Sequence, residues 1–295
     1  MEPSNKRESL AGLLAVVAAF VLWGALPVYW KQLTHVPATV VVAHRTVWTV
    51  AFSLLAVVLW RRGSRLKAAL CRSGVAPRLA LTGGLVLANW LTYIWGVNHG
   101  HVLDTSMGYY INPLVSILLG RFILGEHLRP LQWTAVALAA VGVATLVVAQ
   151  GVFPWIALVL AVTFGLYGLI RKTALVEPLE GLSVETSVMV VPVIALAVLG
   201  GGGLATADGW TWTLLVGTGV ITAIPLLLFA YGVRRVRLST TGFCQYITPS
   251  CLFGLGVLVY GEPFTATGAV SFGLIWTALA IYSADSMRTR RDVAG

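Results

Sequence analysis

The sequence YINPLVSILLGRFILGE, residues 110–126, returns in altered form as YITPSCLFGLGVLVYGE at residues 246–262. Seven positions of the two segments agree at a constant offset of 136 residues, for example Pro113 with Pro249 (249 − 113 = 136). Both segments close on Gly-Glu after an apolar run. Such agreement favours an internal duplication of the chain over chance, and a duplicated chain has a fold built from two similar halves.

A second set of matches lies upstream at a slightly different spacing. An offset of 141 residues pairs Lys31 with Lys172, Pro37 with Pro178, and His44 with Glu185. The change of offset is expected if the first half has a longer basic loop after its second helix. We therefore divide the chain into a first repeat at residues 1–150 and a second repeat at residues 151–295.

Composition places the chain in a membrane. Hydrophobic residues make up 58% of the 295 residues and charged residues 11%, whereas a soluble domain carries about 25% charged residues. The apolar runs are long and unbroken, which indicates helices, because a spanning helix needs about 20 apolar residues. We predict an all-α polytopic membrane protein with ten transmembrane helices, at residues 10–30, 38–60, 78–99, 103–123, 130–149, 153–171, 182–200, 211–231, 238–259 and 264–284.

Positive charge is distributed so as to orient these helices. With the N-terminus in the cytoplasm, eighteen of the twenty Lys and Arg residues lie on the cytoplasmic side, in loops, tails or the inner ends of spans, which leaves Lys31 outside and Arg45 deep within a span. The positive-inside rule therefore predicts a multi-pass protein of the cytoplasmic (inner) cell membrane with both termini cytoplasmic. We interpret the net charge of +9 as a topology signal, in preference to recognition of nucleic acid or of particular lipids.

The number of helices in each repeat determines how the two halves are related. Each half contains five predicted helices, and an odd number sends the second half into the membrane from the opposite side. The sequence therefore predicts two inverted five-helix repeats. Inverted halves can exchange conformations, which produces two states of similar energy that open to opposite faces of the membrane. That property suits a carrier that works by alternating access.

Motifs along the whole chain resemble one known group of transporters. The stretches concerned are LWGALPVYWK (22–31), AHRTVW (43–48), NWLTYIWGVNHG (89–100), GYYINPLVSILLGRFILGE (108–126), FGLYGLIRK (164–172), QYITP (245–249) and YGEPF (260–264). Together they are similar to the RarD-like members of the EamA branch of the drug/metabolite transporter (DMT) superfamily. The resemblance implies ten helices, a membrane-central pathway shared by both halves, and a permease that exports small metabolites or drugs. It also implies a link to chloramphenicol sensitivity or resistance, and it leaves the physiological substrate open.

Arg45 is the most unusual residue of the predicted spans. It lies about eight residues from the outer end of the second helix, or about 12 Å at 1.5 Å per residue. A charge at such a depth costs about 2.5–3.5 kcal/mol, so something must compensate it. One interpretation is a cationic anchor for an anionic group of the substrate, or an element of coupling. The other is an arginine that pairs with a helix end or extends towards the membrane surface.

Two further titratable residues are predicted to be candidates for coupling. His44 adjoins Arg45, but successive helix residues lie about 100° apart, so the two side chains do not face one cavity together. Glu185, the counterpart of His44 in the second half, lies near the inner end of the seventh helix and is the best acidic candidate for proton coupling. The alternative for Glu185 is pairing with a basic loop. A direct ion pair between Arg45 and Glu185 is not expected, because they lie towards opposite faces.

Aromatic and amide side chains deep in the spans complete the predicted site. Mixed polar and stacking surfaces of this kind line pockets for small ligands. With Arg45, the predicted substrate-binding residues are Trp23, Asn89, Tyr93, Tyr110, Asn112, Tyr167, Gln245 and Tyr246. Packing inside the bundle is the alternative for each. Tryptophans near helix ends are typical interface anchors, and to packing or anchoring we assign Trp30, Trp48, Trp60, Trp133 and Trp210.

Several chemistries are absent from the sequence. There is no G-x-x-x-x-G-K-[ST] loop for ATP and no hydrolase or metalloprotease motif. Cys71, Cys244 and Cys251 lack metal-ligand spacing. We therefore predict no enzymatic activity, no cofactor and no bound metal. The first span also lacks the glutamate that serves proton coupling in the related small multidrug-resistance proteins, which leaves the coupling mode open.

These observations together predict a secondary transporter, with export as the favoured direction and proton coupling as an option. The rivals are a channel, a membrane sensor and, least favoured, an intramembrane enzyme. A channel would show single-channel current, whereas a carrier would show exchange stimulated by substrate on the opposite side. The expected partners are a small-molecule substrate and membrane lipid, without nucleic acid. A homodimer is compatible with the sequence.

Overall fold

The computed structural model describes residues 9–151, 153–199, 208–261 and 265–292, and every regular element in these ranges is helical. The first half contributes α1 (Leu10–Trp30), the short η1 (Lys31–Leu33), α2 (Ala38–Leu59), α3 (Gly63–Cys71), α4 (Val75–Asn98), α5 (Val102–Phe122) and α6 (Pro130–Gln150). The second contributes α7 (Trp155–Thr173), α8 (Pro178–Leu199), α9 (Gly209–Val233), α10 (Leu238–Gln245), α11 (Ile247–Gly254), η2 (Leu255–Val259) and α12 (Ala266–Asp292). The predicted all-α fold is confirmed.

Nine spans within the described residues are long and apolar enough to cross a membrane, and α10, α11 and η2 together form one of them. The remaining long helix is α5, which has 21 residues. Its apolar character is diluted by polar residues such as Asp104 and Asn112. It packs along α7 and α10, where Asp104 and Asn112 are partly buried, and it takes the place of the fourth predicted helix.

The structure differs from the sequence prediction in three elements. The expected basic loop after α2 contains a nine-residue helix, α3. The ninth span is interrupted at Tyr246, where Pro249 has no N–H to donate to the carbonyl of Gln245. The last helix continues to Asp292 instead of ending at residue 284. It continues because α6 accommodates its polar side, where Gln132 Nε2 donates to Asp285 Oδ2 at 2.9 Å.

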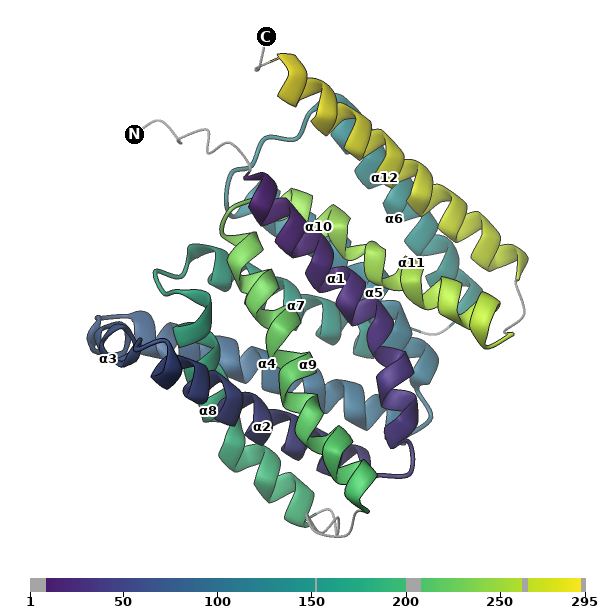
Figure 1. Ribbon diagram of the computed structural model, residues 1–295. Helices are drawn as coiled ribbons and strands as arrows, with labels where there is room; N and C mark the ends of the chain where they lie inside the picture. The colour runs from purple at the N-terminus through teal and green to yellow at the C-terminus, as the bar shows by residue number, and fades with distance from the viewer. Residues whose placement is uncertain (1–8, 152, 200–207, 262–264, 293–295) are drawn as a thin grey trace.

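The pairing of helices is the same when each helix is exchanged for its counterpart in the other half. The pair α4 and α7 corresponds to α9 and α1, and the pair α2 and α9 corresponds to α8 and α4. The pairs α2 with α8, α5 with α10, and α6 with α12 each correspond to themselves. In Figure 1, α6 and α12 lie side by side at one edge of the bundle, and α2 and α8 lie at the other edge.

Two glycines at equivalent positions allow close approaches between the halves. A Cβ atom on Gly83 of α4 would lie 2.7 Å from the carbonyl oxygen of Glu185 in α8. A Cβ atom on Gly219 of α9 would lie 2.5 Å from the backbone carbonyl carbon of Trp48 in α2. The two glycines are separated by 136 residues (219 − 83 = 136), the offset of the repeated segments. Small residues at such positions let membrane helices pack closely.

Contacts between distant loops place the basic segments at one end of the bundle. Arg62 Nη1 lies 3.5 Å from Glu180 Oε1, and Arg234 Nη1 donates to the carbonyl of Val176 at 2.7 Å. The N–H of Ser9 donates to the carbonyl of Arg235 at 3.2 Å. We call this the basic end. The opposite end is held by contacts such as Tyr29 Oη to the carbonyl of Leu214, and His35 Nε2 to Thr211 Oγ1.

Candidate substrate site around Arg45

Arg45 lies where four helices meet. Its Nε donates to Thr222 Oγ1 of α9 at 2.8 Å. Its guanidinium carbon lies 3.8 Å from the ring centroid of Trp90 in α4 and 5.5 Å from that of Trp30 at the end of α1. An arginine over a tryptophan face is attracted by the ring quadrupole, and the attraction strengthens when the pair is removed from water. The local structure therefore compensates the charge without a carboxylate.

The neighbouring sequence explains why these groups converge on Arg45. Gly219 lets α9 approach the backbone of α2, and Thr222 follows three residues later, about one turn along α9. In α4, Asn89 turns towards α7, where its Nδ2 donates to the carbonyl of Leu160 and to Thr163 Oγ1, both at 2.9 Å. Trp90 lies about 100° further round the helix and faces α2.

The terminal nitrogens of Arg45 are left without a protein partner among the described residues. None of the ion pairs in the described part of the chain involves Arg45, and its hydrogen bond uses Nε alone. The side chain is half-buried. The phenol groups of Tyr93 and Tyr109 lie within electrostatic reach of the guanidinium, and these tyrosines are 40% and 38% exposed. A guanidinium with free Nη groups can bind an anionic oxygen pair in two parallel hydrogen bonds.

We refer to Arg45, Trp90, Thr222, Tyr93 and Tyr109 as the Arg45 group. Sequence reasoning identified Arg45 and Tyr93 and overlooked the other three. Tyr109 stands beside the predicted Tyr110 and Trp90 beside the predicted Asn89, so both lie next to predicted residues but on a different face of the helix. Thr222 could have been found from its position about one turn after Gly219, which matches Gly83 of the first half.

His44 lies away from the Arg45 group. It is buried, its Nδ1 accepts from Trp48 Nε1 at 3.3 Å, and its ring meets the edge of Trp212 in α9 at a centroid distance of 5.2 Å. The expected divergence of His44 and Arg45 around the helix is therefore present in the structure. The contacts of His44 are those of a packed aromatic side chain.

Glu185 is the centre of a buried polar cluster near the basic end. Its Oε1 accepts a hydrogen bond from Thr82 Oγ1 of α4 at 2.6 Å and lies 3.5 Å from Arg171 Nη1 of α7. Arg171 is fully buried, and its guanidinium occupies the space that a Cβ atom on Gly181 would fill, with Nη1 2.1 Å from that position. Glu185 thus pairs with Arg171, and no ion pair joins Glu185 to Arg45 within the described residues.

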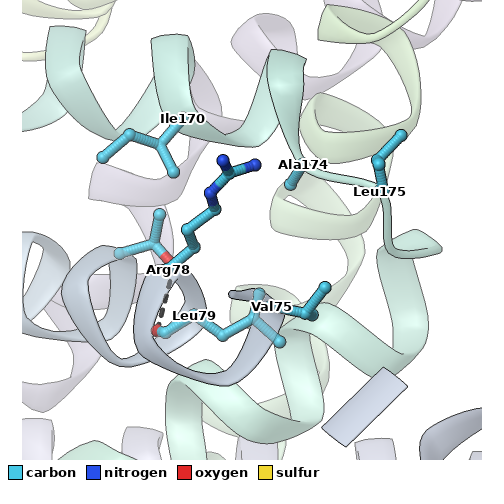
Figure 2. A pocket seen from close by; sticks show the side chains of 7 residues that line it. Val75, Arg78, Leu79, Ile170, Ala174 and Leu175 are labelled. Carbon is cyan, nitrogen blue, oxygen red and sulfur yellow. Dashed lines mark hydrogen bonds between the residues drawn. The ribbon is translucent and has the colours of Figure 1, made fainter. Parts of the chain in front are cut away.

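A small cavity of about 10 Å³ lies beside Thr82, between α4 and the α7 region. Figure 2 shows Val75 and Leu79 of α4 on one side and Ile170, Ala174 and Leu175 on the other, with the side chain of Arg78 between them. A volume of this size has room for about one water molecule. The Thr82 hydroxyl lies 3.0 Å from the carbonyl oxygen of Leu79 as well as near Glu185.

The other predicted residues fall into two separate groups. Trp23 and Tyr167 belong to an aromatic core with Phe20, Phe164 and Phe229, in which Tyr167 stacks on Phe229 at 5.7 Å. The second group follows the seam between α5 and α10 and consists of Tyr110, Asn112, Gln245 and Tyr246. There, Gln245 Nε2 donates to Ser116 Oγ at 2.9 Å, and Tyr246 is fully buried. None of these residues bonds to or stacks on Arg45 in the described part of the chain, although Trp23 and Trp90 pack against the same hydrophobic cluster.

Comparison with known proteins shows similarity over nearly the whole chain. The sequence profile of the EamA-like transporter family matches residues 10–148 and again residues 154–284. An uncharacterized transporter of Vibrio cholerae is 44% identical over 96% of this chain and 95% of its own length. "Protein RarD" of Escherichia coli is 40% identical over 97% of this chain and 98% of its own. "Chloramphenicol-sensitive protein RarD" of Pseudomonas aeruginosa is 34% identical over 98% of both chains.

A solved structure shares the fold. It superposes with a TM-score of 0.74 over 94% of this chain and 98% of its own, at 20% sequence identity, and it is described only as "Crystal structure of protein". At that identity the likeness concerns the arrangement of the helices alone.

Proposed function

The chain belongs to the EamA-like transporter family, and on this premise we propose that it is a secondary carrier that exports a small metabolite or drug across the cytoplasmic membrane by alternating access. The observation that carries the proposal is the unneutralised guanidinium of Arg45, held inside the bundle by Trp90 and Thr222 with its terminal nitrogens free among the described residues. Charged groups inside membrane helices mark substrate or ion pathways. The names of the relatives agree with a transporter rather than an enzyme.

The carrier cycle that we propose rests on two inverted repeats, at residues 1–150 and 151–295. Three observations support this division: the family profile matches the chain twice, the helix pairs correspond when the halves are exchanged, and Gly83 and Gly219 hold equivalent helix crossings. If the halves are equivalent, each can adopt the shape of the other. The two resulting states open to opposite sides.

We assign Arg45 as the anchor of an anionic group on the substrate. The guanidinium presents two Nη groups in the plane that suits a carboxylate or a phosphate. The aromatic rings of Trp30, Trp90, Tyr93 and Tyr109 surround it and favour a flat apolar body next to that anion. Chloramphenicol, which forms part of the name of one relative, is uncharged and would use the aromatic walls without the ion pair. The ligand screen described below distinguishes binding of an anion by Arg45 from binding of an uncharged drug by the aromatic walls.

Proton coupling is proposed to use Glu185, with His44 as the second candidate. Thr82 has one hydroxyl proton but lies within hydrogen-bond distance of two acceptors, the carbonyl of Leu79 and Glu185 Oε1. If Glu185 carries a proton, Glu185 donates to Thr82 and Thr82 donates to Leu79, so that both bonds are complete. When Glu185 is ionised, Arg171 is its partner. Thr82 can therefore serve Glu185 in either state, and the ionised state also has Arg171 as its partner.

The orientation that we propose places the basic end in the cytoplasm. Eighteen of the twenty Lys and Arg residues lie in the segments predicted to be cytoplasmic, and the positive-inside rule assigns such an end to the cytoplasm. Both termini then lie in the cytoplasm.

A ligand screen on the purified protein tests the proposed function. The melting temperatures of the wild type and of Arg45→Ala are measured in the presence of amino acids, aromatic carboxylates, nucleobases and amphenicol drugs. A ligand at about 100 times its Kd stabilises the native state by about 2.7 kcal/mol, which is a measurable shift. We expect stabilisation by one class of anions in the wild type alone. Stabilisation by anions that persists in Arg45→Ala would place the site elsewhere, and the absence of any stabilising small molecule would contradict the proposal.

A further inference from the structure

The corner where α2 passes into α3 holds a cavity that the transport site does not use. The cavity measures about 550 Å³, lies at the basic end, and is lined by Trp60, Arg61, Arg62 and Arg65. Three of the four lining residues are cations and none is an acid. A concentration of positive charge in one hollow attracts an anion, from the protein or from outside it.

The protein neutralises only one of these cations through the residues that the structure describes. Arg62 Nη1 lies 3.5 Å from Glu180 Oε1, and Glu180 is buried, so this ion pair fixes Arg62 in the cavity wall. Arg61 and Arg65 form no ion pair with any described residue. Two unpaired guanidinium groups beside a fixed third form a ready site for phosphate oxygens.

The backbone of Arg61 has a left-handed conformation that usually favours glycine. Arg61 has φ of 52°, and it is the one residue other than glycine with positive φ in the described ranges. Its N–H donates to the carbonyl of Val58, and the N–H of Arg62 donates to that of Val57. This is the Schellman arrangement that ends a helix, and its left-handed position usually carries glycine. An arginine at that position has a backbone cost of about 1–2 kcal/mol, which a binding role of its side chain would account for.

The surroundings of the cavity suit a lipid better than a free anion. The last turn of α2 presents Val58, Leu59 and Trp60 with exposed fractions of 70%, 69% and 65%. These side chains continue the membrane-facing surface of α2 up to the arginines. Tryptophan at such a level is typical of the membrane interface. A free phosphate has no use for an apolar wall, whereas a phospholipid has acyl chains to lay along it.

We propose that this corner binds the headgroup of an anionic phospholipid. The phosphate lies against Arg61, Arg62 and Arg65, and the acyl chains follow the exposed last turn of α2. Basic pockets at the membrane surface are the known means by which proteins hold such headgroups. The assignment is independent of the transported substrate, because the corner and Arg45 lie at different depths of α2.

The test measures binding of a short-chain phosphatidylglycerol to the purified full-length protein by native mass spectrometry, with the matching phosphatidylcholine and inorganic phosphate as comparison ligands. The variant is Arg61→Gln/Arg65→Gln. The control is Lys67→Gln/Arg72→Gln, which removes the same charge from the same segment but outside the cavity lining. We expect the variant to weaken phosphatidylglycerol binding by about tenfold or more and the control by less than about twofold.

Equal losses in the two double variants would overturn the site in favour of diffuse attraction. Displacement of the lipid by inorganic phosphate at similar concentration would show a free-anion site and would also overturn it. Arg61→Gly removes the side chain without destabilising the protein, because glycine adopts the left-handed conformation without strain. A loss of binding in this variant therefore cannot be attributed to misfolding. This variant is expected to unfold at a higher temperature in lipid-free detergent and still to lose phosphatidylglycerol binding. Unchanged binding by Arg61→Gly would argue against the assignment.

Discussion

Arg45 shows how a single charge is accommodated among apolar helices. Its presence inside a span costs about 2.5–3.5 kcal/mol on the insertion scale. A desolvated cation–π contact offsets about 2 kcal/mol, and a hydrogen bond to a charged group about 1.5–3 kcal/mol. Trp90 and Thr222 supply one contact of each kind. These magnitudes are comparable, so the residue can be kept without a carboxylate and remains available to a ligand.

Substitution of Arg45 tests this role. Arg45→Ala removes the anchor and is expected to lower transport of the anionic substrate by at least about tenfold, the loss of one charged hydrogen bond. Arg45→Lys is the matched control, since it keeps the charge but loses the planar pair of Nη groups, and it should retain part of the activity. Transport is measured in proteoliposomes with equal amounts of monodisperse protein. Wild-type rates for Arg45→Ala would remove Arg45 from the site.

Glu185→Gln tests the proposed coupling. The amide keeps the shape of the side chain and its hydrogen bond with Thr82 but cannot take up a proton. We expect exchange of substrate between the two sides to continue while the dependence of transport on an imposed pH gradient is lost. Glu177→Gln is the control, because Glu177 is an exposed acid on the same side that pairs with Arg234. A pH-driven rate that is unchanged in Glu185→Gln would exclude the carboxylate from coupling.

At the residue scale the sequence predicted two members of the candidate site, Arg45 and Tyr93. Arg45 could be found because its burial is costly in any membrane protein. Thr222 and Trp90 could not, since their approach to Arg45 depends on how α9 and α4 cross α2. Tyr167 and Tyr246 were predicted to bind substrate, and the structure places both in full burial. A sequence shows that a tyrosine is deep in a span but not whether a neighbouring helix covers it.

At the scale of the elements, hydrophobic length predicted nine spans that the structure also has, most of them with ends within a few residues of the predicted ones. It did not predict α3, because a segment with several arginines and lysines is typical of a loop. The helix depends on packing of its apolar face, which the sequence does not show. That face packs near the start of α4, where Ala69 joins Val75 and Leu79. The end of α12 was also placed too early, since its polar last turns depend on α6 for their hydrogen bonds.

The glycine crossings give a prediction about helix packing. A methyl group on Gly83 or on Gly219 meets backbone atoms that cannot move aside, so Gly83→Ala and Gly219→Ala should each destabilise the protein by about 1–3 kcal/mol. Gly84→Ala is the control, because open space surrounds that position, and it should stabilise α4 by up to about 1 kcal/mol. Thermal unfolding in detergent measures all three. Similar melting temperatures for Gly83→Ala and Gly84→Ala would contradict the close crossing.

On the scale of the whole molecule, different chemistry holds the two ends of the bundle. Buried or half-buried ion pairs such as Arg171 with Glu185 and Arg62 with Glu180 lie towards the basic end. The opposite end is held by neutral hydrogen bonds and by Lys31 over the ring of Tyr260. If the proposed carrier cycle holds, we expect the contacts at the two ends to break in alternation.

Orientation in the membrane can be tested with a native cysteine. Cys71 of α3 is exposed at the basic end, whereas Cys244 and Cys251 lie in the ninth span. A membrane-impermeant maleimide should therefore label Cys71 in inside-out vesicles and leave it unlabelled in intact cells. Cys71→Ser identifies any background reaction. Labelling of Cys71 in intact cells would place the basic end outside and reverse the proposed topology.

Exchange across the membrane of proteoliposomes tests the central claim most directly. The ligand found in the thermal screen is supplied outside, with or without the same unlabelled ligand inside, and uptake of label is timed. Two halves that exchange shapes around one site predict that internal ligand accelerates uptake, because the loaded carrier returns faster than the empty one. Uptake that is indifferent to internal ligand, together with discrete single-channel currents, would contradict an alternating carrier and indicate an open pore.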